Sequence, residues 1–175
     1  MTRQEEKLAF RRAASTFPTG VCVVATAHEG RPAGMTLNSF VSVSLEPLLV
    51  AVSLAHGSRT RAAVARAGAF SVSVLKRGQR EVAFDFATTS DVFPESHVRR
   101  TDSGYLAVRH ALAFFACEVG DVHAAGDHDL VIGRVVDFSA EEGEPLVFHA
   151  GRFGGVVVDA AAPPGFASLD EGAGW

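Results

Sequence analysis

The chain contains a run of small polar residues that could hold the edge of a flat, uncharged ring. Within 34–44, the side chains of Thr36, Asn38 and Ser39 stand among backbone amides between two strand-like segments. Such groups exchange hydrogen bonds without adding charge, which suits a flavin heterocycle, whose electronics depend on its hydrogen-bond partners. An Asn-Ser pair between strands is also typical of an ordinary turn, so this run alone leaves both interpretations open.

A second candidate site lies where a predicted strand meets a predicted helix, over 53–60. Free backbone amides at a helix N-terminus, together with the helix dipole, favour an anion. Ser58 and Thr60 add hydroxyl donors and Arg59 adds a positive charge, so this junction is a candidate phosphate cradle. The alternative is a surface helix that Ser58 simply caps.

Two further segments carry side chains suited to a dinucleotide. In Gly126-Asp127-His128, between two strands, His128 could contact a nicotinamide or donate a proton, because histidine titrates near neutral pH. Further along, Gly151 allows a close backbone approach, Arg152 could bind a pyrophosphate and Phe153 could stack on a ring. A turn with an exposed histidine and a hairpin with a surface arginine are the alternatives.

The elements that would position these residues are mostly strands. Apolar and β-branched runs predict strands over 21–27, 40–45, 48–54, 70–75, 114–122, 130–138, 145–148 and 153–158. Helical spacing predicts helices over 5–17, 60–67 and 79–87. Turn residues predict a turn over 28–32. Within the strand predicted over 40–45, the side chains of Val41, Val43 and Leu45 are expected to face the same side. Residues 88–104 show no clear period and are predicted to form an excursion or lid. Seven or so short strands with few helices indicate a closed or partly closed β-barrel.

Composition narrows the classes of function. The chain has 175 residues, of which 47% are hydrophobic, and this fits one domain with a sizeable core. We expect that domain over 1–160, followed by a flexible tail over 161–175 that is rich in Ala, Pro and Gly. A net charge of −4 argues against nucleic-acid binding, and no apolar run reaches the roughly 20 residues of a membrane span.

Several common catalytic motifs are absent from the sequence. It has no Gly-x-Gly-x-x-Gly, P-loop or Gly-x-Ser-x-Gly elbow, and its seven histidines show no common zinc spacing, so no metal site is expected. Cys22 and Cys117 lie in apolar runs and are expected to be buried free thiols, although the sequence leaves a disulfide open. Without a signal-peptide pattern at the N-terminus, the expected location is the cytoplasm.

Taken together and in this order, the motifs resemble the flavin reductase-like family, the small reductase components of two-component flavin monooxygenases. The resemblance covers about Phe10 to Val157. Besides the motifs above, it rests on Phe17–Val21, Phe70–Leu75, Gln79, Cys117-Glu118, Gly133 and Pro145-Leu146. It implies a mainly β, FMN-binding split β-barrel of Greek-key type with a few peripheral helices, which forms a homodimer. It also implies an NAD(P)H:flavin oxidoreductase that supplies reduced FMN or FAD to a partner monooxygenase, with NADH or NADPH as reductant.

The resemblance also implies a role for each candidate residue. Those expected at the flavin ring and ribityl chain are Thr36, Leu37, Asn38, Ser39, Ser53 and Leu54. Those expected at the phosphate are Ser58, Arg59 and Thr60. Phe84 would lie near the flavin. The residues expected on the nicotinamide side are Gly151, Arg152, Phe153 and His128, the last being the candidate catalytic residue.

Other functions stay open at this stage. A non-catalytic flavin-binding or flavin-carrying protein would use the same barrel and the same polar run. A barrel that binds another cofactor, such as haem or pyridoxal phosphate, and a purely structural dimerisation module are the remaining alternatives. Oxidation of NADH in the presence of free FMN separates a reductase from a carrier, and the colour of the purified protein separates flavin from other cofactors.

Overall fold

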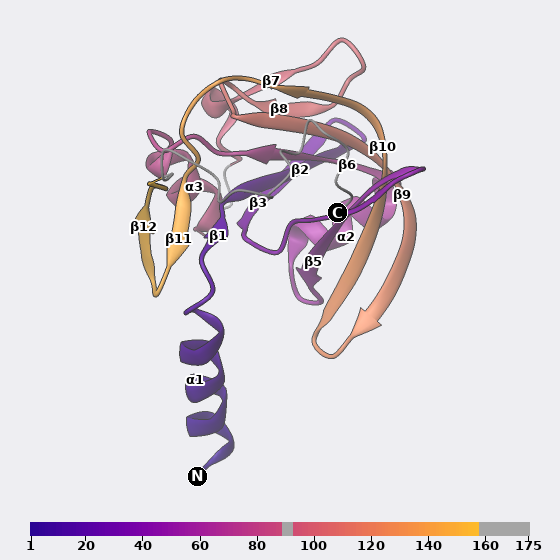
Figure 1. Cartoon of the computed structure of the whole chain (residues 1–175). Coiled ribbons are helices and arrows are strands. Elements are labelled where there is room, and N and C mark those ends of the chain that lie inside the picture. The colour runs from indigo at the N-terminus through magenta and orange to yellow at the C-terminus, as the bar shows by residue number, and fades with distance from the viewer. Residues whose placement is uncertain (89–92, 158–175) are drawn as a thin grey trace.

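The computed structural model of the chain describes residues 1–88 and 93–157, and strands form most of it (Figure 1). The strands are β1 (Thr19–Gly20), β2 (Cys22–His28), β3 (Arg31–Leu37), β4 (Val41–Leu45), β5 (Leu48–Ala55), β6 (Ala69–Val74), β7 (Val98–Arg100), β8 (Leu106–Val108), β9 (Ala113–Ala125), β10 (His128–Ala140), β11 (Val147–His149) and β12 (Arg152–Gly154). The helices are α1 (Arg3–Ala14), α2 (Arg59–Ala67), α3 (Arg80–Ala87) and the short 3-10 helix η1 (Glu95–His97). The tail predicted over 161–175 lies outside these ranges.

Seven antiparallel strands form the main sheet, in the order β3-β2-β6-β9-β10-β5-β4. Its spine is the long hairpin of β9 and β10, which pairs with β6 on one side and with β5 on the other. Two register shifts within this hairpin are β-bulges, which bend the strands and increase their twist. A second sheet of β1, β11 and β12 and a small β7–β8 pair complete a curved, mainly β fold, as predicted (Figure 1).

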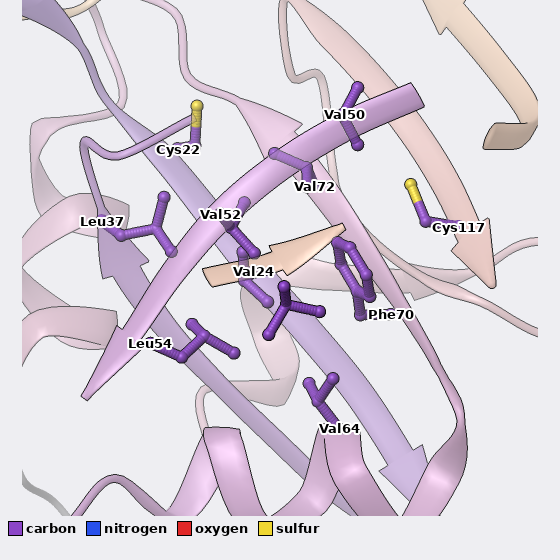
Figure 2. Close-up of a cluster of buried hydrophobic side chains, with 11 residues drawn as sticks. Cys22, Val24, Leu37, Val50, Val52, Leu54, Val64, Phe70, Val72 and Cys117 are labelled. Carbon is purple, nitrogen blue, oxygen red and sulfur yellow. The ribbon is translucent and has the colours of Figure 1, made fainter. Parts of the chain in front are cut away.

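Two hydrophobic cores explain why the central strands are apolar on both faces. Cys22 and Val24 of β2 point into a core shared with β5, β6, β9 and α2, where Val64 of α2 faces the sheet (Figure 2). Val21 and Val23 point the other way, into a core under α3. Burial on both faces gives a nearly continuous apolar run instead of an alternating one. The thiols of Cys22 and Cys117 are buried and free, as predicted.

The structure corrects several predicted boundaries. α1 begins earlier, because Thr2 and Glu5 form a capping box, and it ends at Ala14 instead of at 17. The turn predicted over 28–32 is only Glu29 and Gly30, and the residues after it form β3. The irregular run 88–104 holds η1 and β7 in its described part. Strands β9 and β10 are 13 residues each and extend beyond the predicted ends.

Some apolar side chains remain outside the core. α1 stands away from the rest of the fold and has no buried residue (Figure 1). Val41, Val43 and Leu45 of β4 are all exposed, and a bulge around Val43 interrupts the alternation predicted for that strand. In the ranges that the structure covers, no helix has both the length and the apolar character to cross a membrane.

Candidate functional site

The polar run at the end of β3 is tied to two other elements. Thr36 Oγ1 donates a hydrogen bond to the backbone carbonyl of Ala83 in α3 at 2.8 Å. Asn38 Nδ2 donates to Thr19 Oγ1 at the start of β1, at 3.1 Å. Leu37, between them, is buried in the core, so only its backbone can meet a ligand. The run is therefore a fixed edge held between α3 and β1.

Ser39 and Ser53 are bonded directly to each other. The Ser53 backbone N–H donates to Ser39 Oγ at 3.0 Å, and the Ser39 hydroxyl donates to the Ser53 carbonyl at 3.2 Å. A hydroxyl has one hydrogen, so Ser39 and Thr36 have no donor left for a ligand and can only accept. The donors that remain along this edge are backbone amides and the amide group of Asn38.

The register of β10 with β5 decides which side chains share a face. Leu130 lies opposite Ser53, and Asp129 lies opposite Leu54, which is buried in the core. Opposite residues point to the same face, and so do alternate residues along one strand. His128 therefore shares a face with Ser53, whereas Asp129 points the other way, toward α2.

The turn between β9 and β10 orients His128. Gly126 and Asp127 form this two-residue turn, and Gly126 adopts a φ of 65°, which favours glycine. Nδ1 of His128 lies 2.7 Å from Asp127 Oδ1. This hydrogen bond is the main cause that lowers the pKa of Asp127 below its ordinary 3.8, so the carboxylate stays charged and holds the imidazole ring.

The first turn of α2 faces a cavity of about 730 Å³. Ser58 caps the helix, as predicted, because its Oγ accepts the Arg61 N–H at 3.0 Å. The first amides of a helix have no intrahelical acceptor, so the Thr60 N–H remains a donor beside the Thr60 hydroxyl. Arg59 and Thr60 both line the cavity, and the first turn carries no acidic residue. These features suit an anion.

Asp129 anchors this helix terminus to β10. Its Oδ2 lies 2.6 Å from both Nε and Nη2 of Arg61, and its Oδ1 lies 2.9 Å from His56 Nε2. The Asp129 side chain is only 6% exposed. The hydrogen bond from Arg61 is the main cause that lowers the pKa of the carboxyl, and His56 adds to it. None of these three residues was predicted to belong to the site, although an acidic residue directly before the apolar run 130–138 was a usable signal.

Comparison with known proteins identifies the family. The family described as "Flavin reductase like domain" matches residues 14–156 of the chain. The chain belongs to the flavin reductase-like family. An FMN reductase (NADH), SmoA, from Agrobacterium fabrum is 39% identical over 151 residues, which are 86% of each protein. The reductase subunit HsaB of a flavin-dependent monooxygenase from Mycobacterium tuberculosis is 33% identical over 93% of this chain and 89% of its own length.

Solved structures of flavin reductases share the fold. An NADH:FAD oxidoreductase of Streptomyces globisporus, in complex with NAD and FAD fragments, has a TM-score of 0.85 at 30% identity, over 92% of this chain and 99% of its own. Component B of a nitrilotriacetate monooxygenase from Mycobacterium thermoresistibile has a TM-score of 0.86 at 31% identity, over 97% of each chain. These likenesses confirm the split-barrel fold.

Aromatic rings of this flavin reductase-like chain meet beside α3. Phe84, which is 58% exposed, contacts Phe153 edge-to-face with ring centroids 5.2 Å apart. Phe153 in turn packs on Phe148, at 5.5 Å. Because Ala83 is bonded to Thr36, this aromatic group lies next to the polar edge of β3.

The chain does not bring all the predicted residues of the flavin reductase-like site together. Gly151 and Arg152 lie at the end of the β11–β12 hairpin, with Arg152 exposed. Figure 1 shows this hairpin on the other side of the fold from the β9–β10 turn that carries His128. The two halves of the expected nicotinamide side are therefore apart within one chain. Among the described residues, no cluster of His, Cys, Asp or Glu could hold a metal ion.

Proposed function

We propose that this chain is an NAD(P)H-dependent flavin reductase that supplies reduced FMN or FAD to a partner flavin-dependent monooxygenase. The observation that carries the proposal is the position of the α2 N-terminus, which presents Thr60 and Arg59 to a cavity of about 730 Å³. The proposal of a monooxygenase partner is supported by relatives that are named as reductase components of monooxygenases. The name of SmoA, an FMN reductase (NADH), makes NADH the first reductant to test. The free thiols fit a reducing compartment such as the cytoplasm.

The residues present fit a flavin nucleotide. Its phosphate would accept hydrogen bonds from the Thr60 N–H and hydroxyl, while Arg59 supplies positive charge. Its ring edge would lie along the backbone amides of 37–39 and the side chain of Asn38. The mutual hydrogen bonds of Ser39 and Ser53 hold that edge in place before any ligand binds.

The chain would act by positioning and by excluding water. When bound, a flavin would supply the redox chemistry, as the acceptor of a hydride from a reduced nicotinamide. Phe84 and Phe153 provide an apolar surface that keeps water from one side of the site. His128, held by Asp127, would orient the nicotinamide from the face that it shares with Ser53. Direct hydride transfer needs no acid or base from the protein.

We also infer a homodimer. Several of the exposed apolar residues lie on α1, where Leu8 and Phe10 are exposed, on β4, and on β10, where Phe138 is 59% exposed and stacks on Phe115. A second copy seated on these surfaces would remove them from water. It would also account for the separation of His128 from Arg152 within one chain, since each site would then take residues from both copies.

Anaerobic mixing of the purified protein with NADH and FMN tests the proposed activity. The expected result is loss of NADH absorbance together with bleaching of the visible flavin absorbance, at a rate that depends on the protein concentration. Flavin that binds without any oxidation of NADH would establish a non-catalytic flavin carrier instead. If neither FMN nor FAD bound saturably, no flavin site would exist and the proposal would fall.

A further inference from the structure

His56 lies in the short connection between β5 and α2, and it is bonded to the residues on both sides of His128. Its backbone N–H donates to the carbonyl of Asp127 at 3.0 Å. Its ring Nε2 lies 2.9 Å from Asp129 Oδ1. The ladder between β5 and β10 ends where Ala55 pairs with His128, so these two bonds continue the pairing beyond the ladder. A single residue of the connection therefore holds the start of β10 at two points.

The charge of Asp129 determines how the imidazole of His56 is held. Because the hydrogen bond from Arg61 lowers the pKa of Asp129, the carboxylate is ionised at neutral pH and can only accept hydrogen bonds. Nε2 of His56 must therefore carry a hydrogen and donate it, which fixes the tautomer of the neutral ring. The His56 side chain is 44% exposed, whereas the carboxylate beneath it is buried. The ring is thus held from the inside by one directed bond.

The carboxylate that accepts this bond also orients the first turn of α2. Its Oδ2 lies 2.6 Å from Nε of Arg61, and the backbone N–H of Arg61 donates to the capping hydroxyl of Ser58. Thr60, to which we assign the flavin phosphate, directly precedes Arg61 in this capped turn. A displacement of Asp129 would therefore move the phosphate end of the site, and a displacement of the β9–β10 turn would move His128.

We propose that His56 is a positioning residue that couples the two ends of the site. It holds the turn that carries His128 and, through Asp129, the helix terminus that binds the flavin phosphate. The inference rests on the proposed function, because it takes the phosphate to lie at Thr60 and the nicotinamide at His128. Coupling between two binding sites is reciprocal, so an arrangement stabilised by a ligand at one end favours binding at the other.

Two substitutions of His56 test the bond between its ring and Asp129. His56→Ala removes the donor and keeps the backbone bond to Asp127, and because the side chain is 44% exposed, the variant is expected to fold. It should raise the FMN dissociation constant and the KM for NADH by about three- to ten-fold each. Riboflavin lacks the phosphate and should bind as it does to the wild type. His56→Gln carries an amide N–H that can reach the same carboxylate oxygen, so it should recover most of both losses.

A double-mutant cycle with His128→Ala separates coupling from a general loss of stability. If His56 holds the turn that carries His128, then His128→Ala should raise the KM for NADH by a smaller factor in the His56→Ala background than in the wild type. Independent effects would multiply instead. His110→Asn is the matched control, since it removes an exposed histidine from the turn after β8, where a φ of 57° suits asparagine. It should change neither constant.

Three outcomes would overturn the coupling while leaving the flavin reductase intact. In the first, His56→Ala lowers the melting temperature but leaves the FMN dissociation constant and the KM for NADH at their wild-type values, so the ring bond serves only the fold. In the second, riboflavin and FMN lose affinity equally, or His56→Gln recovers nothing. In the third, the two effects on KM multiply in the cycle. A wild type that neither binds FMN nor oxidises NADH would instead remove the proposed function, before any variant is compared.

Discussion

The carboxylate of Asp129 on β10 lies 2.6 Å from both Nε and Nη2 of Arg61 on α2. This pair joins two elements that are far apart in the sequence, and Arg61 directly follows Thr60, whose amide we assign to a flavin phosphate. His56 joins from the end of β5, at 2.9 Å from the same carboxylate. The direction in which the α2 N-terminus points therefore depends on one buried side chain from a neighbouring strand.

Asp129→Asn should lower the melting temperature by several degrees at neutral pH and raise the FMN dissociation constant several-fold, because Arg61 and His56 lose their anionic partner. Since Arg61 lowers the pKa of Asp129, the carboxylate stabilises the fold fully above its ordinary pKa of 3.8, and that contribution is lost as the pH falls through the lowered value. The difference in melting temperature between wild type and variant should therefore shrink in acid. Thermal melts over a pH series measure it.

A matched variant separates this effect from general loss of charge. Glu118→Gln removes the partner of Arg134 from an exposed ion pair on β9 and β10, and such pairs contribute about 0–1 kcal/mol. It should change neither the melting temperature nor FMN binding appreciably. If the difference in melting temperature between wild type and Asp129→Asn stayed constant from neutral to strongly acidic pH, it would contradict the assigned ion pair.

Gly133→Ala should destabilise the fold by about 1–3 kcal/mol, as overpacking of a core does. A Cβ at this position would lie 2.5 Å from Phe70 Cζ and 2.9 Å from Cys117 Cβ, where β10 crosses the main core. Urea titrations measure the loss. Gly154→Ala is the control, because a Cβ there meets nothing within 4 Å. Adding Phe70→Leu to Gly133→Ala should restore part of the lost stability. If it restored none, the strain would have to lie elsewhere.

Local signals predicted much of this fold. The Ser58 cap, α2, α3 and the central strands β2, β5 and β6 lie within one or two residues of their predicted bounds, since each has its own pattern of apolar spacing and its own breakers. β3 was missed because Pro32 and the turn residues before it favoured a loop. As an edge strand of the sheet, β3 tolerates that proline, and an edge position is not visible in a sequence.

Non-local pairing explains what the sequence did not reveal about the site. The two residues of β1 pair with Phe148 and Val147, far along the chain, and nothing in Thr19-Gly20 indicates this. Thr36 and Ser39 were predicted as hydrogen-bond donors to a ring, but their hydroxyl hydrogens go to the carbonyls of Ala83 and Ser53. Residue types predicted that this edge is polar, whereas the carbonyls that use up its hydroxyl donors belong to other elements.

Phe138→Asp should convert a dimer to a monomer if β10 lies in the interface between two copies. Phe138 is 59% exposed and stacks on Phe115 at 6.5 Å, so a charge there would be buried without a partner on association. Light scattering after size-exclusion chromatography gives the mass. Ser139→Asp places the same charge on the opposite face of β10 and should leave the dimer intact. Equal dissociation by both variants, or a monomeric wild type, would refute this interface.

Thr60→Val should weaken FMN binding about ten-fold, because a hydrogen bond to a charged group contributes about 1.5–3 kcal/mol and valine keeps the shape of the side chain. Riboflavin lacks the phosphate, so its affinity should not change. Titration of the visible flavin absorbance or fluorescence with wild type and variant measures both constants. An equal loss for riboflavin and FMN would mean that Thr60 acts on the ring or on the fold, and the phosphate would have to bind elsewhere.

His128→Ala should raise the KM for NADH and lower kcat/KM about ten-fold, while the FMN dissociation constant stays unchanged. His128 shares a face of the β5–β10 pair with Ser53, next to the predicted ring edge, whereas the residues assigned to the phosphate lie at the start of α2. Asp127→Asn keeps the imidazole but weakens the hydrogen bond that holds it, so its effect on KM should have the same direction and a smaller size. Steady-state kinetics with NADH at saturating flavin measure both variants, and full kcat/KM in His128→Ala would exclude the histidine from the nicotinamide side.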